Sequence, residues 1–411
     1  MEVPKYLDSA LLKTVVQKGY NLDEVEIIST KIEIATSPGD NYNSIIYRVF
    51  LTITDSRKDQ KKIQFILKDL TNMEQGGLLI DYRAIHEKEV DMLKNILPRF
   101  TKLTQGVQFS PRFYYTIPES HMMIIAMEDL RELNYRMVNR RDGLDYEHCR
   151  LSLTKLGHLH AASMSASIDA DDPSSMKKYE FGLFHGTDKK PAVIRQCFSL
   201  NFTKLCEVVK NWEGFEAISE KLERMKDKFW YIVDESISKK HDGYRVLNHG
   251  DFWINNILFK YNESTGKPID VKIVDFQNCF YTTPANDLQF FFNSSLQNDV
   301  RENHKDDLLR IYYDAFASSL NNLQQDLIPS FRDLEEEMRK KEMFGFLAAV
   351  FVLPVALMEE QSSQKSGFDD FLDEETRNTL TMFMFSGKKF AETMKAILKQ
   401  CDDLKIFDIE Y

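Results

Sequence analysis

The sequence has no surplus of positive charge and no paired cysteines. Its 411 residues include 53 Lys and Arg against 64 Asp and Glu, so a nucleic-acid-binding surface, which needs clustered cations, is not expected. No two of the five cysteines form a C-x-x-C pair, which argues against a zinc or redox motif and favours reduced intracellular thiols. The cysteines are Cys149, Cys197, Cys206, Cys279 and Cys401.

Long hydrophobic runs are also missing. The first thirteen residues, MEVPKYLDSALLK, lack a basic stretch followed by an apolar one, so no signal peptide is expected. The most apolar run, 343–358, is about one turn too short to span a membrane and contains Pro354. It predicts a buried helix kinked at the proline, in a cytoplasmic protein without a membrane span.

Several catalytic motifs are absent as well. There is no G-x-S-x-G, no P-loop, no G-x-G-x-x-G and no H-E-x-x-H, which excludes the usual hydrolase, P-loop, dinucleotide-binding and zincin sites. His158 and His160 are two positions apart, so on a helix they face different directions and cannot form a zinc pair. His160 lies on an apolar stripe with Cys149 and is expected to be buried.

The elements that are present fall into two groups. The first third is rich in strand signals, with β-branched and aromatic residues in partial alternation between polar turns. Residues 84–97 have helical spacing that Pro98 is expected to stop, and 122–130 read as a further buried strand. The strand signals before that helix are residues 27–36, 45–54 and 61–70.

Beyond residue 131 the pattern is mostly helical, with Asp145 as a predicted helix N-cap. A polar hairpin between short strands interrupts it. The sequence therefore divides into a small lobe, residues 1–130, and a large helical lobe, residues 131–411, with the hairpin at residues 249–280.

The hairpin carries the strongest chemical signal. It begins with HGDFWINN at residues 249–256, in which Asp251 and Asn256 have the D-x-x-x-x-N spacing of kinase catalytic loops. Asp275 follows at the end of an apolar strand, where a metal-binding carboxylate is expected. The alternative is structural: Asp251 caps a turn and Asp275 only ends a strand. The order and separation of the two motifs favour a phosphoryl-transfer site, with His249 orienting the loop or, less simply, acting in catalysis itself.

The first third supplies the other parts of such a site. Lys68 ends a strand, and Glu89, chosen over Glu87, lies on the following helix, as expected for a lysine that reaches phosphates and pairs with a helix glutamate. The strand MMIIAMEDL would then lead into a hinge. The backbone of Met127, Glu128 and Asp129 would bond the adenine edge.

These segments, with LGHLHAAS and VDFQNCFYTTPANDLQFF, resemble the insect ecdysteroid kinase-like family. This family is related to choline kinases and aminoglycoside phosphotransferases, and the matches run in order from about residue 35 to 320. The resemblance implies an α+β fold of the two-lobed protein-kinase type, with a small mixed β-sheet N-lobe and a large, mainly helical C-lobe. It also implies ATP as donor, Mg²⁺, and a small-molecule hydroxyl as acceptor.

The resemblance also implies individual roles. Asp251 would be the general base, Asn256 and Asp275 would bind Mg²⁺, and Lys68 would pair with Glu89 over the phosphates. Asp287, in PANDLQFF, would be scaffolding for the catalytic loop.

The phosphate-covering turn departs from the family pattern. The family has a glycine-rich turn, whereas this sequence has only Gly39 there, and Asn41, Asn43 and Ser44 would present backbone N–H groups instead. Next to the proposed base, Trp253 and Phe280 are the predicted residues of an apolar acceptor pocket.

Two functions of different classes follow. The first is an ATP- and Mg²⁺-dependent kinase acting on a hydroxyl of an ecdysteroid or another apolar metabolite or xenobiotic. The alternative is a non-catalytic binding protein that uses the kinase fold to sequester a lipophilic ligand. Protein kinase activity is disfavoured because no A-P-E segment follows Asp275.

Overall fold

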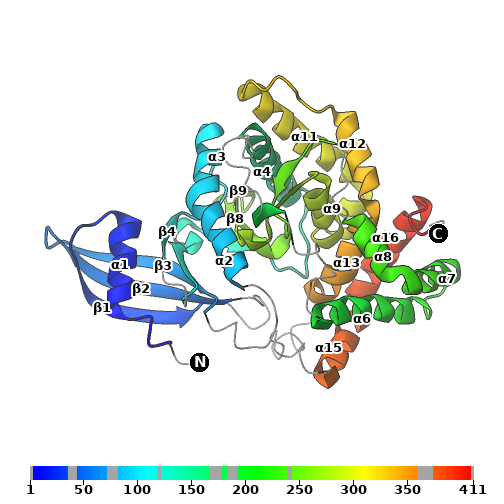
Figure 1. Ribbon diagram of the computed structural model, residues 1–411, viewed down its shortest axis with the longest axis horizontal. Helices are drawn as coiled ribbons and strands as arrows, with labels where there is room; N and C mark the ends of the chain where they lie inside the picture. The colour runs from blue at the N-terminus through cyan, green and yellow to red at the C-terminus, as the bar shows by residue number, and fades with distance from the viewer. Residues whose placement is uncertain are drawn as a thin grey trace.

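The computed structural model describes residues 3–35, 44–71, 82–117, 122–166, 178–180, 182, 192–237, 243–358 and 374–408. The small lobe is a five-stranded sheet in the order β1-β2-β3-β5-β4, in which every pairing is antiparallel. The sheet lies at one end of the molecule (Figure 1). Its strands are β1 (Val25–Ile34), β2 (Ile45–Asp55), β3 (Gln60–Asp69), β4 (Phe113–Thr116) and β5 (Ile124–Glu128).

The two faces of this sheet differ. Helix α1 (Ser9–Tyr20), capped by the side chain of Asp8, covers one face, where Val49 and Phe65 are fully buried with the apolar side of α1. Alternate residues of β2 and β3 point the other way, and those of β2, with Gln64 and Ile66 of β3, are only half-buried. Because that second face also carries Lys68, the open side of the sheet looks toward the large lobe.

The helical connection after β3 differs from the expectation in one respect. Helix α2 (Tyr82–Asp91) continues through one π-helical turn (Met92–Ile96) into α3 (Leu97–Leu103), so Pro98 does not stop the helix. Pro98 lies in the first turn of α3, where its missing N–H is not needed by the helix. The prediction that the proline ends the helix was therefore wrong.

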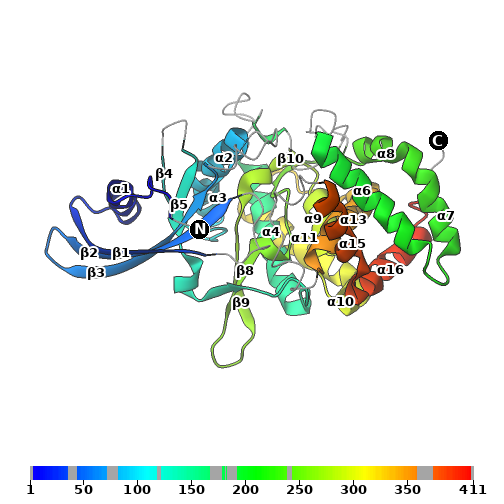
Figure 2. The same cartoon turned by 90° about the horizontal axis from the view of Figure 1, so that it is seen from below.

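The large lobe is mainly helical. A three-stranded sheet β6-β8-β9 and the pair β7-β10 lie on its side facing the small lobe, and the β8–β9 turn projects from the molecule (Figure 2). Its strands are β6 (Tyr135–Met137), β7 (Val246–Asn248), β8 (Ile257–Tyr261), β9 (Pro268–Ile273) and β10 (Phe280–Thr282). Its helices are α4 (Tyr146–Ser165), α6 (Ala192–Val209), α7 (Glu216–Met225), α8 (Phe229–Ser236), α9 (Ala285–Ser294), α10 (Asn298–Asn303), α11 (Lys305–Asn322), α12 (Phe331–Lys340), α13 (Glu342–Ala356), α15 (Glu374–Ser386) and α16 (Lys388–Asp403).

Short helical turns join these elements. The predicted division at residue 130 falls where β5 gives way to the turn η3 (Leu130–Leu133). Further such turns are η6 (Lys226–Lys228), η7 (Ile254–Asn256) and η8 (Phe276–Asn278).

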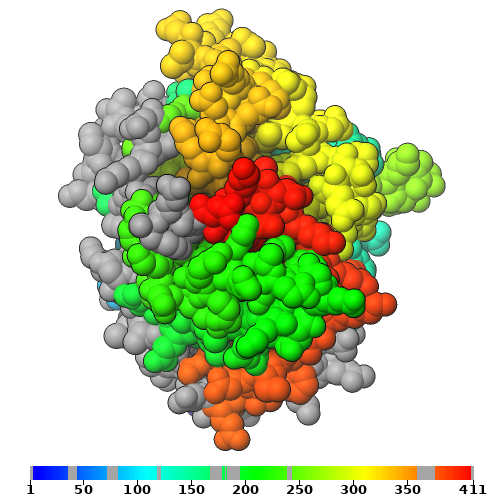
Figure 3. Space-filling view, turned by 90° about the vertical axis from the view of Figure 1, so that its right-hand side faces the viewer, coloured from blue at the N-terminus to red at the C-terminus, as the bar shows by residue number. Residues whose placement is uncertain are grey.

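Two apolar clusters fill the large lobe. One surrounds α4, α9 and α11, and the other joins α6, α7, α8, α13 and α16. At the far end of the lobe α7 and α16 lie side by side (Figure 3), linked by an ion pair of 2.7 Å between Lys221 and Asp402. Most residues of α13 are buried, and Pro354 lies two residues before its end. Among the described helices, none is long and apolar enough to cross a membrane.

The predicted two-lobed α+β arrangement is confirmed. Asp145 caps α4 as predicted, by accepting a hydrogen bond from the backbone N–H of His148. Cys149 and His160 are both buried along that helix. All five cysteines fall within the described ranges, and none of them forms a disulfide.

Candidate active site

The polar loop between β7 and η7 turns sharply at Gly250. The φ angle there is +81°, and a Cβ at this position would lie 2.1 Å from the carbonyl oxygen of Asn278. Both the backbone conformation and the close approach require glycine. The turn therefore brings the loop directly against the segment that follows Asp275.

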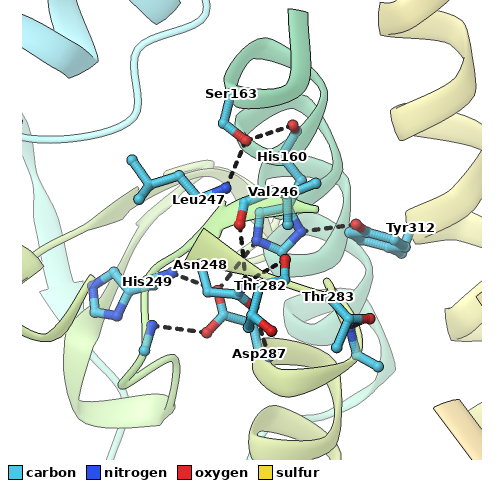
Figure 4. Close-up of polar contacts among 12 residues, drawn as sticks. His160, Ser163, Val246, Leu247, Asn248, His249, Thr282, Thr283, Asp287 and Tyr312 are labelled. Atoms are coloured by element: carbon cyan, nitrogen blue, oxygen red, sulfur yellow. Dashed lines mark hydrogen bonds and ion pairs between the residues drawn. The ribbon is translucent and has the colours of Figure 1, made fainter. Parts of the chain in front are cut away.

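Asp287 anchors this loop from below (Figure 4). It lies in the first turn of α9, is 1% exposed, and accepts hydrogen bonds from the backbone N–H groups of His249 at 2.6 Å and Gly250 at 2.9 Å. His160 Nε2 lies 3.2 Å from the same carboxylate, and His160 Nδ1 lies 2.8 Å from the hydroxyl of Tyr312. Three elements, α4, α9 and α11, thus hold the loop backbone in place, as expected if Asp287 is scaffolding.

His249 is engaged at both ring nitrogens. The backbone N–H of Asp251 lies 3.3 Å from Nδ1, and Nε2 lies 3.0 Å from the carbonyl oxygen of Val274. Burial lowers the pKa of His249, so the ring is neutral, with its proton on Nε2. This arrangement fits an orienting role, because neither nitrogen is left for proton transfer.

Asp251 has the electrostatics of a proton acceptor. Burial raises the pKa of Asp251 to about 7, and the negative charge of Asp275 adds to the effect. The amide nitrogen of Asn256 opposes it by donating to Oδ2 of Asp251 at 3.1 Å, and the same nitrogen also donates to the backbone oxygen of Asp251 at 2.9 Å. A carboxylate with this pKa can take up and release a proton near neutral pH.

Lys68 connects the two lobes. Its Nζ lies 2.6 Å from Glu89 Oε2 on α2 and 2.6 Å from Asp275 Oδ1 in the hairpin, and the lysine is 4% exposed. Burial alone would lower the pKa of Lys68, but the carboxylates of Asp275 and Glu89 outweigh it and hold the pKa above its ordinary value. Asp275 itself adopts φ +69°, a left-handed conformation that aspartate tolerates better than most residues. The structure therefore gathers these three residues into one charged cluster.

The oxygen donors beside this cluster suit a divalent cation. Asp275 and the amide oxygen of Asn256 are ligands of the kind that Mg²⁺ takes when phosphate and water supply the rest. Gln277 is 2% exposed, and its amide nitrogen donates to Asp275 Oδ2 at 3.3 Å. Its Oε1 is buried without a partner among the described residues, and a metal-bound water would satisfy it. In the described part of the chain, no three His, Cys, Asp or Glu side chains gather as a metal cluster, so phosphate would have to complete this site.

The residues of the predicted hinge are buried, and some of their backbone groups already form hydrogen bonds within the protein. The backbone N–H of Glu128 donates to the carbonyl of Arg112, and the carbonyl of Asp129 accepts from the N–H of Glu132. The side chain of Asp129 caps η3 through the N–H of Arg131. Adenine would thus have to use the remaining backbone groups of this segment.

Little of the phosphate-covering turn can be placed. Ser44 is buried at the start of β2. Gly39, Asn41 and Asn43 lie outside the described residues.

The sequence that forms this site also matches a known protein family. The model of the ecdysteroid kinase-like family matches residues 38–325, which include Lys68, Glu89 and the whole hairpin. The chain belongs to the ecdysteroid kinase-like family. A search of curated protein sequences finds no match.

Among solved structures, this family member is distantly similar to three small-molecule kinases. Amicoumacin kinase hAmiN, in complex with AMP-PNP, Ca²⁺ and Ami, is 12% identical, with coverage of 96% of this chain and 94% of that one, and a TM-score of 0.40. Choline kinase LicA from Streptococcus pneumoniae is 11% identical, with 95% and 100% covered and a TM-score of 0.36. A choline/ethanolamine kinase family protein from Mesorhizobium loti is 12% identical, with 90% and 92% covered and a TM-score of 0.34.

The two predicted acceptor-pocket residues have different surroundings in this family member. Trp253, two residues after Asp251, is half-buried and packs against both apolar clusters of the large lobe. Phe280 is 4% exposed and lies against Gly182 and Gly250. Trp253 therefore retains surface for a ligand, whereas Phe280 mainly supports the loop.

Sequence reasoning missed one contact between the lobes close to Glu89. Asp91, two residues after Glu89, accepts hydrogen bonds from the hydroxyl of Tyr179 at 2.7 Å and from Lys178 at 3.1 Å. Tyr179 is 1% exposed, so a segment of the large lobe is fastened to the end of α2. Nothing in the local sequence pattern of residues 178–180 signals this contact, which depends on the tertiary fold.

Proposed function

We propose that this chain is an ATP- and Mg²⁺-dependent kinase that phosphorylates a hydroxyl group of a small apolar molecule, such as an ecdysteroid or another hydroxylated metabolite or xenobiotic. The observation that carries the proposal is the position of Lys68, which joins Glu89 of the small lobe to Asp275 of the hairpin at 2.6 Å each. A protonated lysine between a helix carboxylate and a metal-binding carboxylate is the arrangement that phosphoryl transfer needs.

The nucleotide would lie between the open face of the sheet and the hairpin. Lys68 would neutralise phosphate charge there, and Asp275 with Asn256 would hold Mg²⁺. When bound, Mg²⁺ would offset the negative charge that develops on the transferred phosphoryl group.

Asp251 would act on the acceptor. With a pKa of about 7, its carboxylate can accept the proton of the acceptor hydroxyl as that oxygen bonds to the γ-phosphorus and the bond to the β-phosphate oxygen breaks. The products would be ADP and the phosphate ester. Asn256 and the loop anchored by Asp287 would keep the carboxylate aimed at the hydroxyl.

The apolar character of the acceptor is supported by Trp253. This side chain joins the catalytic loop to an aromatic-rich cluster that includes Phe198, Trp230 and Phe351. An apolar ring system that packs near Trp253 would bring its hydroxyl toward Asp251. Together with the family assignment, this favours a steroid or similarly hydrophobic alcohol in a cytoplasmic setting.

The direct test is transfer of labelled phosphate. Purified protein, γ-labelled ATP and Mg²⁺ are incubated with a panel of ecdysteroids, other sterols and hydroxylated plant metabolites, and the products are separated and identified by mass. We expect a phosphate ester of at least one apolar alcohol, about 10³-fold less of it per unit time from Asp251→Asn, and none in EDTA. A protein that binds these alcohols tightly, ignores nucleotide and makes no ester would instead be the non-catalytic carrier.

A further inference from the structure

The open face of the small-lobe sheet carries an arginine that the proposed reaction has not used. On β2 and β3, the cross-strand neighbours Ile46 and Lys68, and Arg48 and Ile66, lie on the same side of the sheet. This is the side away from α1, because the alternate residues Val49 and Phe65 are fully buried beneath α1. Arg48 therefore shares the face of Lys68, one cross-strand pair nearer the hinge.

Arg48 is tied to the hinge itself. Its Nε lies 2.5 Å from Asp129 Oδ2, and Gln64 of β3 donates to the same oxygen. The side chain of Arg48 is only 13% exposed and that of Asp129 3%. The ion pair between Arg48 and Asp129 is short and largely shielded from solvent, so it fixes the guanidinium in one orientation.

The two terminal nitrogens of the Arg48 guanidinium take no part in this ion pair. Among the described residues, Nη1 and Nη2 of Arg48 have no hydrogen-bond partner, and Asp129 already balances the charge. Successive same-face residues of a strand are about 7 Å apart, so Arg48 lies over the hinge end of the cleft and Lys68 over its phosphate end. A charge-balanced planar group at the hinge end suits an aromatic ring better than a phosphate.

We infer that the Arg48 guanidinium, held by Asp129, stacks on the purine base of the nucleotide and positions it against the hinge. This inference rests on the proposed function, since it assigns the base end of the nucleotide site whose phosphate end is Lys68. Arg48 is then a base-binding residue, and Asp129 is a positioning residue that acts through it.

Arg112 provides a matched control at the same hinge. Its Nε lies 2.8 Å from Glu128 Oε1, but it also contacts Tyr114, which packs against Tyr20 of α1. This second arginine–carboxylate pair therefore lies on the α1 side of the sheet, away from the cleft. The Arg48–Asp129 pair and the Arg112–Glu128 pair therefore lie on opposite faces of the small-lobe sheet.

The experiment measures binding of MgATP and of Mg²⁺ with inorganic tripolyphosphate, which has no base, by calorimetry. For Arg48→Met we expect the Kd of MgATP to rise about tenfold and that of tripolyphosphate to stay within about twofold. Arg48→Lys, which keeps the charge but not the plane, should fall between wild type and Arg48→Met. Arg112→Met should leave both ligands within about twofold of wild type.

Asp129→Asn tests the positioning role. Asparagine still caps η3 but loses the charge that holds Arg48, so we expect an increase of about threefold in the MgATP Kd. The double variant should bind no more weakly than Arg48→Met alone.

Equal weakening of both ligands by Arg48→Met, or no change in either, would overturn the stacking role. If wild-type protein binds tripolyphosphate and MgATP equally, no base site exists and the inference also fails. If wild-type protein binds neither ligand, the proposed function itself fails, and that failure is visible without any variant.

Discussion

The Asp251 loop, residues 249–256, and the Lys68 cluster are both largely buried, yet they are held in different ways. The loop depends on Asp287, whose oxygens are occupied by two backbone N–H groups and by His160. In the cluster, one lysine holds Glu89 and Asp275, and among the residues that the structure describes the second oxygen of Asp275 has a single contact, at 3.3 Å with Gln277. The Asp287 carboxylate therefore has hydrogen-bond partners on both oxygens, whereas the Asp275 carboxylate can exchange its partners.

This difference has a chemical meaning. A carboxylate bound by fixed backbone donors has no reason to move, so Asp287 keeps the loop in shape whether or not a ligand is present. A carboxylate bound by a flexible lysine can release it to a phosphate and take a cation in its place. The comparison therefore predicts large catalytic effects in both regions and large effects on stability only around Asp287.

The largest effect should come from the proposed base. Asp251→Asn keeps the size of the side chain but cannot accept a proton, so kcat should fall about 10³-fold. The Kd of MgATP should stay within about threefold of wild type, because Asp251 is not part of the proposed nucleotide contacts. Wild-type kcat in this variant would show that Asp251 is not the base.

Asp287→Asn should damage both activity and folding. The NH₂ group of the new asparagine would face a backbone N–H donor of the loop, with which it cannot form a hydrogen bond. We therefore expect the free energy of unfolding to fall by about 3 kcal/mol, and kcat to fall about 100-fold because the loop shifts. The matched control is Asp270→Asn. Asp270, on β9, likewise accepts two hydrogen bonds, from the side chains of Tyr135 and Lys155, but its own side chain is 40% exposed. We expect a loss below about 1 kcal/mol there and no change in kcat; equal losses in the two variants would contradict the special role of Asp287.

The raised pKa of Asp251 should also appear in the pH dependence of stability. Between its ordinary value of 3.8 and about 7, the folded protein holds a proton that the unfolded chain has released, so this group stabilises the fold at low pH and the benefit is lost as pH rises through 7. Relative to Asp251→Asn, wild type should lose about 2–3 kcal/mol between pH 5 and pH 8. Denaturant unfolding at both pH values measures this, and a flat difference would mean that the pKa is not raised.

Tyr312→Phe should give the smallest change. It removes one hydrogen bond to His160 at the far end of the anchoring chain, which predicts a loss of about 1 kcal/mol in stability and less than a twofold change in kcat. Tyr146→Phe, whose hydroxyl contacts Asp307 at the surface, is the control and should lose under about 0.5 kcal/mol. A tenfold fall in kcat for Tyr312→Phe would show that His160 does more than orient Asp287.

The sequence predicts the two lobes and the hairpin well because their signals are local. Alternation marks β2 and β3, and Asp145 caps α4 where the pattern begins. The prediction that Pro98 ends the helix was wrong because a single π-helical turn precedes the proline, and no residue pattern signals that turn in advance.

Within the candidate site, spacing points to Asp251, Asn256 and Asp275, because their order along the chain is itself the motif. Lys68 and Glu89 are identified by their order relative to that motif. Arg48 and Tyr179 are not, because their partners lie 81 and 88 residues away and the pairing exists only in the folded chain.

Binding of ATP with and without Mg²⁺, measured by calorimetry on wild type and Asp275→Asn, tests the central claim most directly. Wild type should bind ATP at least tenfold more tightly with Mg²⁺ than in EDTA, and Asp275→Asn should lose that difference while still folding. Binding that is the same with and without Mg²⁺ in both proteins, or no binding at all, would contradict the account of this site as a metal-dependent kinase centre.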